Sequence, residues 1–146
     1  FCENKVIVTS VNEEQQPTLS KDIYLGSDCL VFYQPAGTYL AWIYVGVPKS
    51  SLTSNLNKDN FKVFFDNNEY EVSSADIKER NPSSTWLEDV RLEQCINSGR
   101  TFSSNEYIYH LRIIFSQENR VNEETGQLKI RLDLSDNTFT EKSRSY

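Results

Sequence analysis

A strict alternation of apolar and charged residues near the C-terminus is the feature that most constrains the fold. Leucine or isoleucine stands at every second position from 128 to 134, and the positions between them hold Lys129, Arg131 and Asp133. A period of two places successive side chains on opposite faces of a β-strand, whereas a helix needs a period of about 3.6. We therefore predict a strand over Gln127–Leu134, with Leu128, Ile130 and Leu132 buried and the charged side chains outside.

Eight other segments have the composition of β-strands. They are rich in β-branched and aromatic residues and are separated by turn-forming residues. The expected strands are 5–11, 22–25, 29–33, 38–47, 61–65, 70–72, 87–95 and 106–115. Residues 66–69 (DNNE) predict a tight hairpin, because Asp and Asn tolerate positive φ. The polar stretch 116–126 predicts a second, long hairpin between the strands on either side of it.

About eight short strands with alternating faces predict an all-β fold, most simply a two-sheet antiparallel sandwich. The chain has 146 residues, which suits one domain of ordinary size. No segment indicates an amphipathic helix, an internal repeat or a domain boundary. We expect a single β-sandwich domain over residues 1–139, followed by a polar tail or linker over residues 140–146.

The cysteines and the first residue favour an exported protein. The chain begins with Phe1 and contains no methionine, as expected if a secretory signal has been removed, although an excised fragment would begin in the same way. Cys2, Cys29 and Cys95 suit one disulfide with one cysteine left over, in any of three pairings. Three reduced thiols are the alternative. The expected location is extracytoplasmic: secreted, cell-surface or periplasmic.

The charge balance narrows the class of partner. The chain carries 15 Lys and Arg against 21 Asp and Glu, a net charge of −6. Nucleic acids and anionic membranes need a basic face, so neither is expected as the main partner. The longest apolar run, 39–47, is far shorter than the roughly 20 residues of a membrane-spanning helix. Membrane insertion is therefore not expected, and a protein is the expected partner.

No set of residues predicts catalysis or a cofactor. His110 is the one histidine, and we expect it to be an ordinary surface or edge residue of its strand. No Gly-x-Ser-x-Gly motif accompanies it, and the cysteines are too widely spaced for a zinc site. The carboxylates match no EF-hand and suit turns. We therefore expect no metal, no cofactor and no enzymatic activity.

The spacing of two cysteines and a tryptophan resembles immunoglobulin domains. Trp42 follows Cys29 by 13 residues, and Cys95 follows Cys29 by 66. In that family the tryptophan packs on a disulfide between the two sheets. The resemblance implies an immunoglobulin-like sandwich with Cys29–Cys95 as the first choice of disulfide. Cys2–Cys29 and Cys2–Cys95 are the other pairings.

Two further resemblances concern shorter motifs. Residues 2–95, with YLGSDC at 24–29, are similar to the amino-terminal half-domain of zona-pellucida modules, which polymerise or mediate cell-surface recognition. Residues 61–72 (FKVFFDNNEYEV) are similar to a strand-turn-strand of telokin-like domains in bacterial lipoproteins. All three families are immunoglobulin-like sandwiches, so they agree on the fold, and none implies a functional residue here.

These observations together favour an extracytoplasmic protein-binding module for adhesion, assembly or recognition. The strand Gln127–Leu134 is the expected sheet edge, where a partner could add a strand beside Lys129, Arg131 and Asp133. The alternative is a secreted or periplasmic inhibitor or immunity protein that blocks a basic partner enzyme. The acidic loop Ser116–Gly126 would then form the contact. The sequence predicts no particular oligomeric state.

Overall fold

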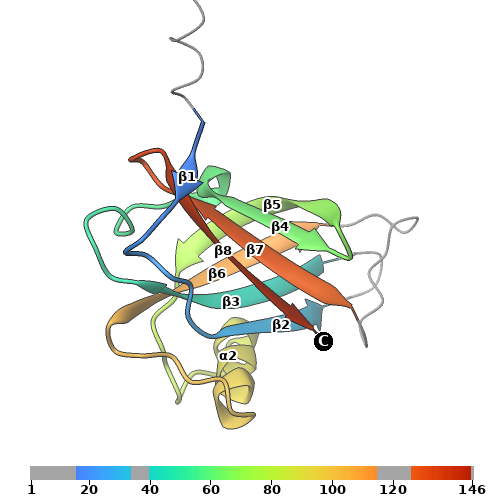
Figure 1. Cartoon of the computed structure of the whole chain (residues 1–146). Helices are drawn as coiled ribbons and strands as arrows, with labels where there is room; N and C mark the ends of the chain where they lie inside the picture. Colours follow the sequence, from blue (N-terminus) through green and yellow to red (C-terminus); the bar gives the residue numbers. More distant parts are fainter. Residues whose placement is uncertain (1–15, 34–39, 115–125, 146) are drawn as a thin grey trace, which may run out of the picture.

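Backbone hydrogen bonds join eight strands into one curved sheet. The structure is a computed structural model and describes residues 16–33, 40–114 and 126–145. The strands follow the order β1-β8-β7-β4-β5-β6-β3-β2. Neighbours are antiparallel except β1 and β8, which are parallel. The sheet curls into a half-barrel, and a helix lies outside it (Figure 1).

The elements have the following bounds. The strands are β1 (Thr18–Leu19), β2 (Asp28–Tyr33), β3 (Leu40–Pro48), β4 (Phe61–Phe65), β5 (Asn68–Ile77), β6 (Glu106–Ile114), β7 (Gln127–Asp133) and β8 (Thr138–Ser145). The helices among the described residues are a 3-10 turn, η2 (Lys58–Asn60), and an α-helix, α2 (Leu87–Asn97). The structure is thus mostly β, as the sequence predicts, and a single helical turn lies in the polar stretch before β4.

The core fills the concave side of the sheet, where alternate side chains of the strands converge. Its largest fully buried members include Ile43, Val45, Val47, Val63, Tyr109, Leu111, Ile113, Leu128, Ile130 and Leu132. The predicted burial of alternate residues in β7 is therefore confirmed. The predicted turn before β5 is also confirmed, because Asp66 and Asn67 have φ values of 51° and 69°. Asp and Asn adopt such φ values at low energetic cost in a two-residue hairpin.

The strand β5 joins the two halves of the sheet, where the sequence predicts two separate sheets. β5 pairs with β4 through Asn68–Tyr70 and with β6 from Glu71 to Ile77, with a register shift between Val72 and Ser74. This irregularity lets β5 turn the sheet around the core, since a bulge increases local twist and bend. The result is one continuous mixed sheet, and the expected two-sheet antiparallel sandwich is not what these strands form.

Two predictions about strand pairing are wrong. β6 pairs with β3 and β5, and β7 pairs with β4 and β8, so the two strands do not form the expected long hairpin. β7 also has a neighbour on each side and is therefore not a sheet edge. Residues 22–25 form no strand. The strand expected over residues 5–11 lies outside the described residues.

The segment 87–95 forms a helix where a strand was expected. Asp89, Leu92 and Cys95 are the buried residues of α2, spaced three apart along one side of the helix. Only two of these three buried residues are apolar, and Trp86 at the N-cap makes no capping hydrogen bond through its side chain. The usual sequence signals of a helix are therefore weak, and contacts with the sheet decide the conformation instead.

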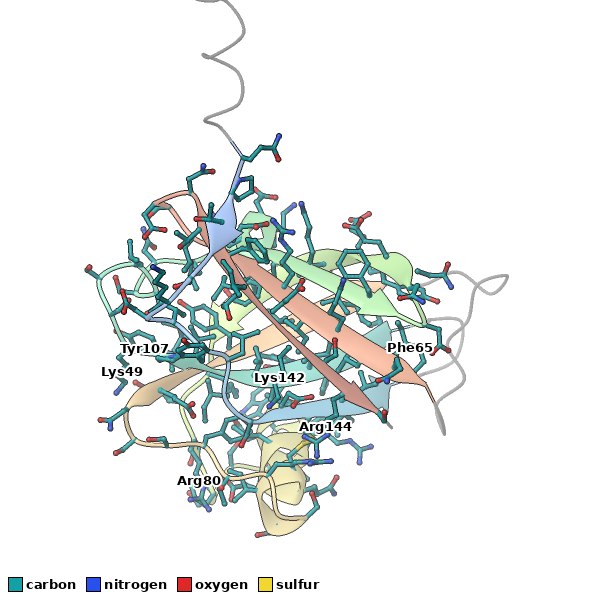
Figure 2. All side chains as sticks on the ribbon, viewed as in Figure 1. Lys49, Phe65, Arg80, Tyr107, Lys142 and Arg144 are labelled. Carbon is teal, nitrogen blue, oxygen red and sulfur yellow. A yellow bond between two sulfur atoms is a disulfide. The ribbon has the colours of Figure 1, made fainter. Side chains whose placement is uncertain are left out.

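The expected polar tail is a strand. Residues 138–145 form β8, which pairs with β7 from Phe139 to Ser145. Thr140, Lys142 and Arg144 share the face that turns towards β2. Lys142 and Arg144 each place a side-chain nitrogen 3.1 Å from Oδ1 of Asp28, which is 1% exposed. Figure 2 labels both cations beside β2. An ionic seam between β8 and β2 therefore closes the open side of the half-barrel.

Candidate functional site

A disulfide holds α2 against the convex face of the sheet. Cys29 on β2 is bonded to Cys95 on α2, and their Cα atoms are 6.1 Å apart. This is the pair that the immunoglobulin resemblance implies. Trp42 packs in the same buried cluster, together with Tyr44 and Leu92. However, Cys95 lies on a helix, so the bond ties that helix to one sheet and does not join two sheets. Cys2 lies outside the described residues.

An aromatic stack forms the floor beneath α2. The ring of His110 lies flat on Tyr44, with centroids 4.7 Å apart, and meets Trp42 edge to face at 5.2 Å. The Tyr44 hydroxyl donates a 2.8 Å hydrogen bond to the backbone carbonyl of Glu88 at the first turn of α2. Burial raises the pKa of Tyr44 far above its usual value, so the hydroxyl keeps its proton. The first turn of α2 is thereby fixed to β3.

His110 is buried inside the sheet, contrary to the expectation of a surface or edge residue. Its side chain is 5% exposed, and burial lowers its pKa to about 4. The ring is therefore neutral at physiological pH. Nδ1 lies 3.9 Å from Oε2 of Glu88, and Nε2 has no hydrogen-bond partner among the described residues. His110 lines none of the hollows described below and acts as a packing residue beneath the helix.

Paired charges surround the start of α2. Lys78 Nζ lies 2.6 Å from Asp89 Oδ1 and 3.7 Å from Glu88 Oε2. Arg112 contacts the other oxygen of the Glu88 carboxylate and also lies over the ring of Trp42. Hydrogen bonds from Lys78 and Ser84 lower the pKa of Asp89. Two cations thus face two carboxylates, and each charge has an opposite charge beside it.

A cleft opens between this charged cluster and the loop that leads into α2. It has a volume of about 390 Å³ and is lined by Trp42, Lys78, Trp86, Leu87, Glu88 and Asp89. Trp86 is 79% exposed, while Trp42 is buried at the base of the cleft. These two residues are the only tryptophans in the chain. An exposed indole therefore lies at the rim of this cleft.

Two further hollows continue from the cleft, and Lys78 lines all three. They have volumes of about 570 and 430 Å³ and share Ile77, Glu79 and Arg80. Arg80 is held by two hydrogen bonds to the Glu93 carboxylate, of 2.7 and 2.9 Å. In Figure 2, Arg80 lies beside α2. We call five of the residues along these hollows the Trp86 surface: Ile77, Lys78, Arg80, Trp86 and Leu87.

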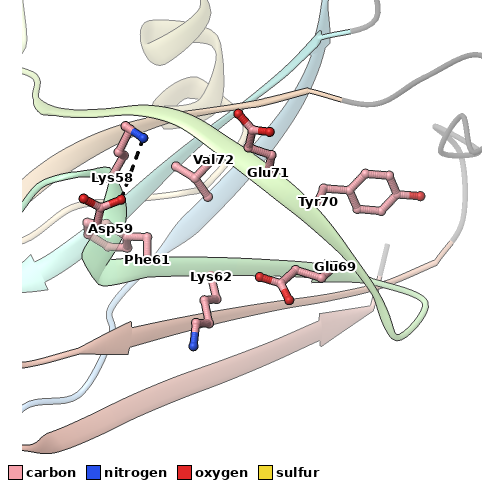
Figure 3. A pocket seen from close by; sticks show the side chains of 8 residues that line it. All are labelled: Lys58, Asp59, Phe61, Lys62, Glu69, Tyr70, Glu71 and Val72. Atoms are coloured by element: carbon pink, nitrogen blue, oxygen red, sulfur yellow. Dashed lines mark ion pairs between the residues drawn. The ribbon is translucent and has the colours of Figure 1, made fainter.

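A separate hollow of about 500 Å³ lies between η2, β4 and β5 (Figure 3). Its lining residues are Lys58, Asp59, Phe61, Lys62, Glu69, Tyr70, Glu71 and Val72. Lys58 pairs with Asp59 at 3.7 Å, and the other charged side chains are spread around a rim that is open to solvent. This arrangement does not direct several polar groups at one point, as a catalytic or small-molecule site would.

The contact residues suggested by the sequence lie together, but on an interior strand. Lys129 lies over the ring of Phe64 at 4.7 Å, and Arg131 lies over Phe139 at 4.1 Å. The Arg131 guanidinium also donates a 2.9 Å hydrogen bond to Asp133. Because both edges of β7 are paired, a partner cannot add a strand there. A role for these side chains in contacting a partner through the sheet face stays a prediction.

Sequence reasoning missed the Trp86 surface. A lone tryptophan in the polar stretch 81–86 (NPSSTW) was the available signal, because an apolar side chain in such a loop has no strand to bury it. Within the described residues, no group of three or more His, Cys, Asp or Glu side chains is placed to hold a metal ion. Nor does that part of the chain contain a helix long and apolar enough to cross a membrane. No protein-family model, curated protein or solved structure matches this chain.

Proposed function

We propose that this chain is an extracytoplasmic protein-binding module, for adhesion, assembly or recognition, and that it binds its partner through the Trp86 surface. The observation that carries the proposal is the 79% exposure of Trp86 beside a cleft of about 390 Å³. Burying a tryptophan removes a large apolar area from water, and tryptophan and arginine are enriched among residues that dominate binding energy.

The attachment of this surface to the domain also supports the proposal. The Cys29–Cys95 disulfide holds the C-terminal part of α2, and the bond from Tyr44 to the Glu88 carbonyl and the ion pair of Lys78 with Asp89 hold its first turn. A surface that is already ordered loses little entropy when it binds. The disulfide is also of the kind that persists in oxidising compartments, which supports an extracytoplasmic location.

The alternative role as an inhibitor of a basic enzyme depends on the acidic loop Ser116–Gly126. Residues 116–125 lie outside the described residues, so no structural observation favours that loop as a contact. The Trp86 surface has two cationic side chains, Lys78 and Arg80, and three exposed apolar side chains, so it is not the acidic face that a basic enzyme would attract. We therefore keep the binding module as the proposed function.

Quantitative pull-down under oxidising conditions tests the proposal. The bait would be the full chain, as wild type, Trp86→Ala and Tyr24→Ala. Tyr24 is the matched control because its aromatic side chain is 64% exposed and lies outside the three hollows. We expect a protein that the wild type and Tyr24→Ala retain equally and that Trp86→Ala retains at least tenfold less well. Equal retention by all three baits would contradict the proposed surface.

A further inference from the structure

The tryptophan cleft has apolar walls and a charge-balanced rim. Trp42 forms its base, and Trp86 and Leu87 form one side. The charged lining residues are Lys78, Glu88 and Asp89. Arg112, which approaches from β6, contacts Glu88. Which ligands can enter the cleft therefore depends on whether these four charged groups are already paired with one another.

All four charges are already compensated within the chain. Asp89 is bound by Lys78 at 2.6 Å, and only 8% of its side chain is exposed. Glu88 contacts Arg112 and lies 3.7 Å from Lys78. An incoming cation would have to compete with Lys78 and Arg112 for these carboxylates. An incoming anion would lie beside the same carboxylates and be repelled by them.

A ligand can therefore gain binding energy only from contact with the apolar surface of the cleft. We propose that the cleft receives one neutral, apolar or aromatic side chain of the partner protein, packed between Trp86, Leu87 and Trp42. The proposal rests on the proposed function and adds the chemistry of the partner's anchor residue. Aromatic rings pack well against indole in offset or edge-on geometry, as Trp42 already does with His110.

The size of the cleft fits this occupant. Sites for small molecules typically enclose about 300–1,000 Å³, and the cleft, at about 390 Å³, lies near the lower end of that range. A single side chain such as phenylalanine or leucine therefore fits within it. The rest of the partner would lie over the neighbouring hollows, where Ile77 and Arg80 are exposed at the surface.

The test uses the full chain and three matched probes. They are the α-amides of N-acetylated phenylalanine, lysine and glutamate, which present a neutral aromatic, a cationic and an anionic side chain on the same backbone. The readout is the NMR signals of the two indole N–H groups. Both report on the cleft, because Trp42 and Trp86 line it and the chain has no other tryptophan. Trp86→Ala leaves Trp42 as the single reporter at the base.

We expect the phenylalanine amide to shift both indole signals saturably, with millimolar affinity, and the two charged amides to bind at least tenfold more weakly. Trp86→Ala should weaken binding of the phenylalanine amide at least tenfold, Leu87→Ala should weaken it several-fold, and Tyr24→Ala should leave it unchanged. Circular dichroism would verify that each variant is folded. Equal or tighter binding of either charged amide would overturn the proposal.

The failure of this inference can be told apart from the failure of the proposed function. If the phenylalanine amide does not bind but partner capture still depends on Trp86, the proposed function stands and the neutral anchor is wrong. If the amide binds but partner capture is independent of Trp86, the cleft is a small-molecule site and both proposals are overturned. If sedimentation velocity shows a dimer that Trp86→Ala disperses, the occupant is a second copy of this chain and the separate partner is excluded.

Discussion

Removing the Cys29–Cys95 disulfide should destabilise the protein by about 4 kcal/mol. The bond joins residues that are 66 positions apart in the sequence. In the chain-entropy account, closing a loop of this length restricts the unfolded state by about 4 kcal/mol at 25 °C. The double variant Cys29→Ala/Cys95→Ala also leaves a small void, because Cys95 is almost fully buried. The entropic contribution is expected to dominate.

Urea unfolding followed by circular dichroism would measure this loss under two-state conditions. With an unfolding entropy of about 2.1 cal/mol/K per residue, a loss of about 4 kcal/mol lowers the melting temperature of a chain of this length by roughly 13 °C. Cys2→Ala is the control, because it leaves the Cys29–Cys95 bond intact. A difference below about 1 kcal/mol, or peptide mapping that finds all three thiols alkylated, would refute the reasoning.

Other predictions concern the core, the buried histidine and the face of β7. Ile130→Ala should lower the free energy of unfolding by about 2–5 kcal/mol in urea titration, because Ile130 is fully buried; a loss below about 1 kcal/mol would contradict that packing. The pKa of His110 is about 4 when folded and 6.5 in its ordinary state, so the unfolded chain takes up the proton first as the pH falls. The neutral His110 ring therefore contributes fully to the free energy of unfolding above pH 6.5, and up to about 3 kcal/mol of it is lost as the pH falls towards 4. In His110→Phe, the free energy of unfolding measured in urea should vary less with pH between those values. The same pH dependence in the variant and the wild type would contradict the lowered pKa of His110. Lys129→Glu/Arg131→Glu should leave partner capture unchanged if the Trp86 surface is the contact, whereas the interpretation from sequence predicts a loss.

Strands with an apolar inner face could be predicted from the sequence. In β7 every second side chain enters the core, so the local sequence pattern alone shows which side chains are buried. β8 has no such pattern, because Lys142 and Arg144 stand where apolar residues would be expected. Their counterpart is Asp28, which lies more than a hundred residues earlier in the sequence. Local periodicity does not reveal this strand, because the cations on its inner face are neutralised by a carboxylate from a distant part of the sequence.

The helix and the candidate site escaped prediction for a related reason. In α2, Asp89 and Arg91 alternate with Val90 and Leu92, which suggests a strand, and few apolar residues mark a helical stripe. The helix depends on the disulfide to β2 and on the aromatic floor made by Trp42 and Tyr44, both of which are tertiary features. The Trp86 surface exists only once that helix is in place. Propensity is a weak guide where such contacts decide the conformation.

Amide hydrogen exchange, with and without the captured partner, tests the central claim most directly. It compares the Trp86 surface with the face of β7 in one experiment on the unmodified chain. Our account predicts slower exchange of residues 77–89 in the complex, with the amides of β7 unchanged. Protection confined to β7 or to other parts of the sheet, with none over residues 77–89, would contradict it.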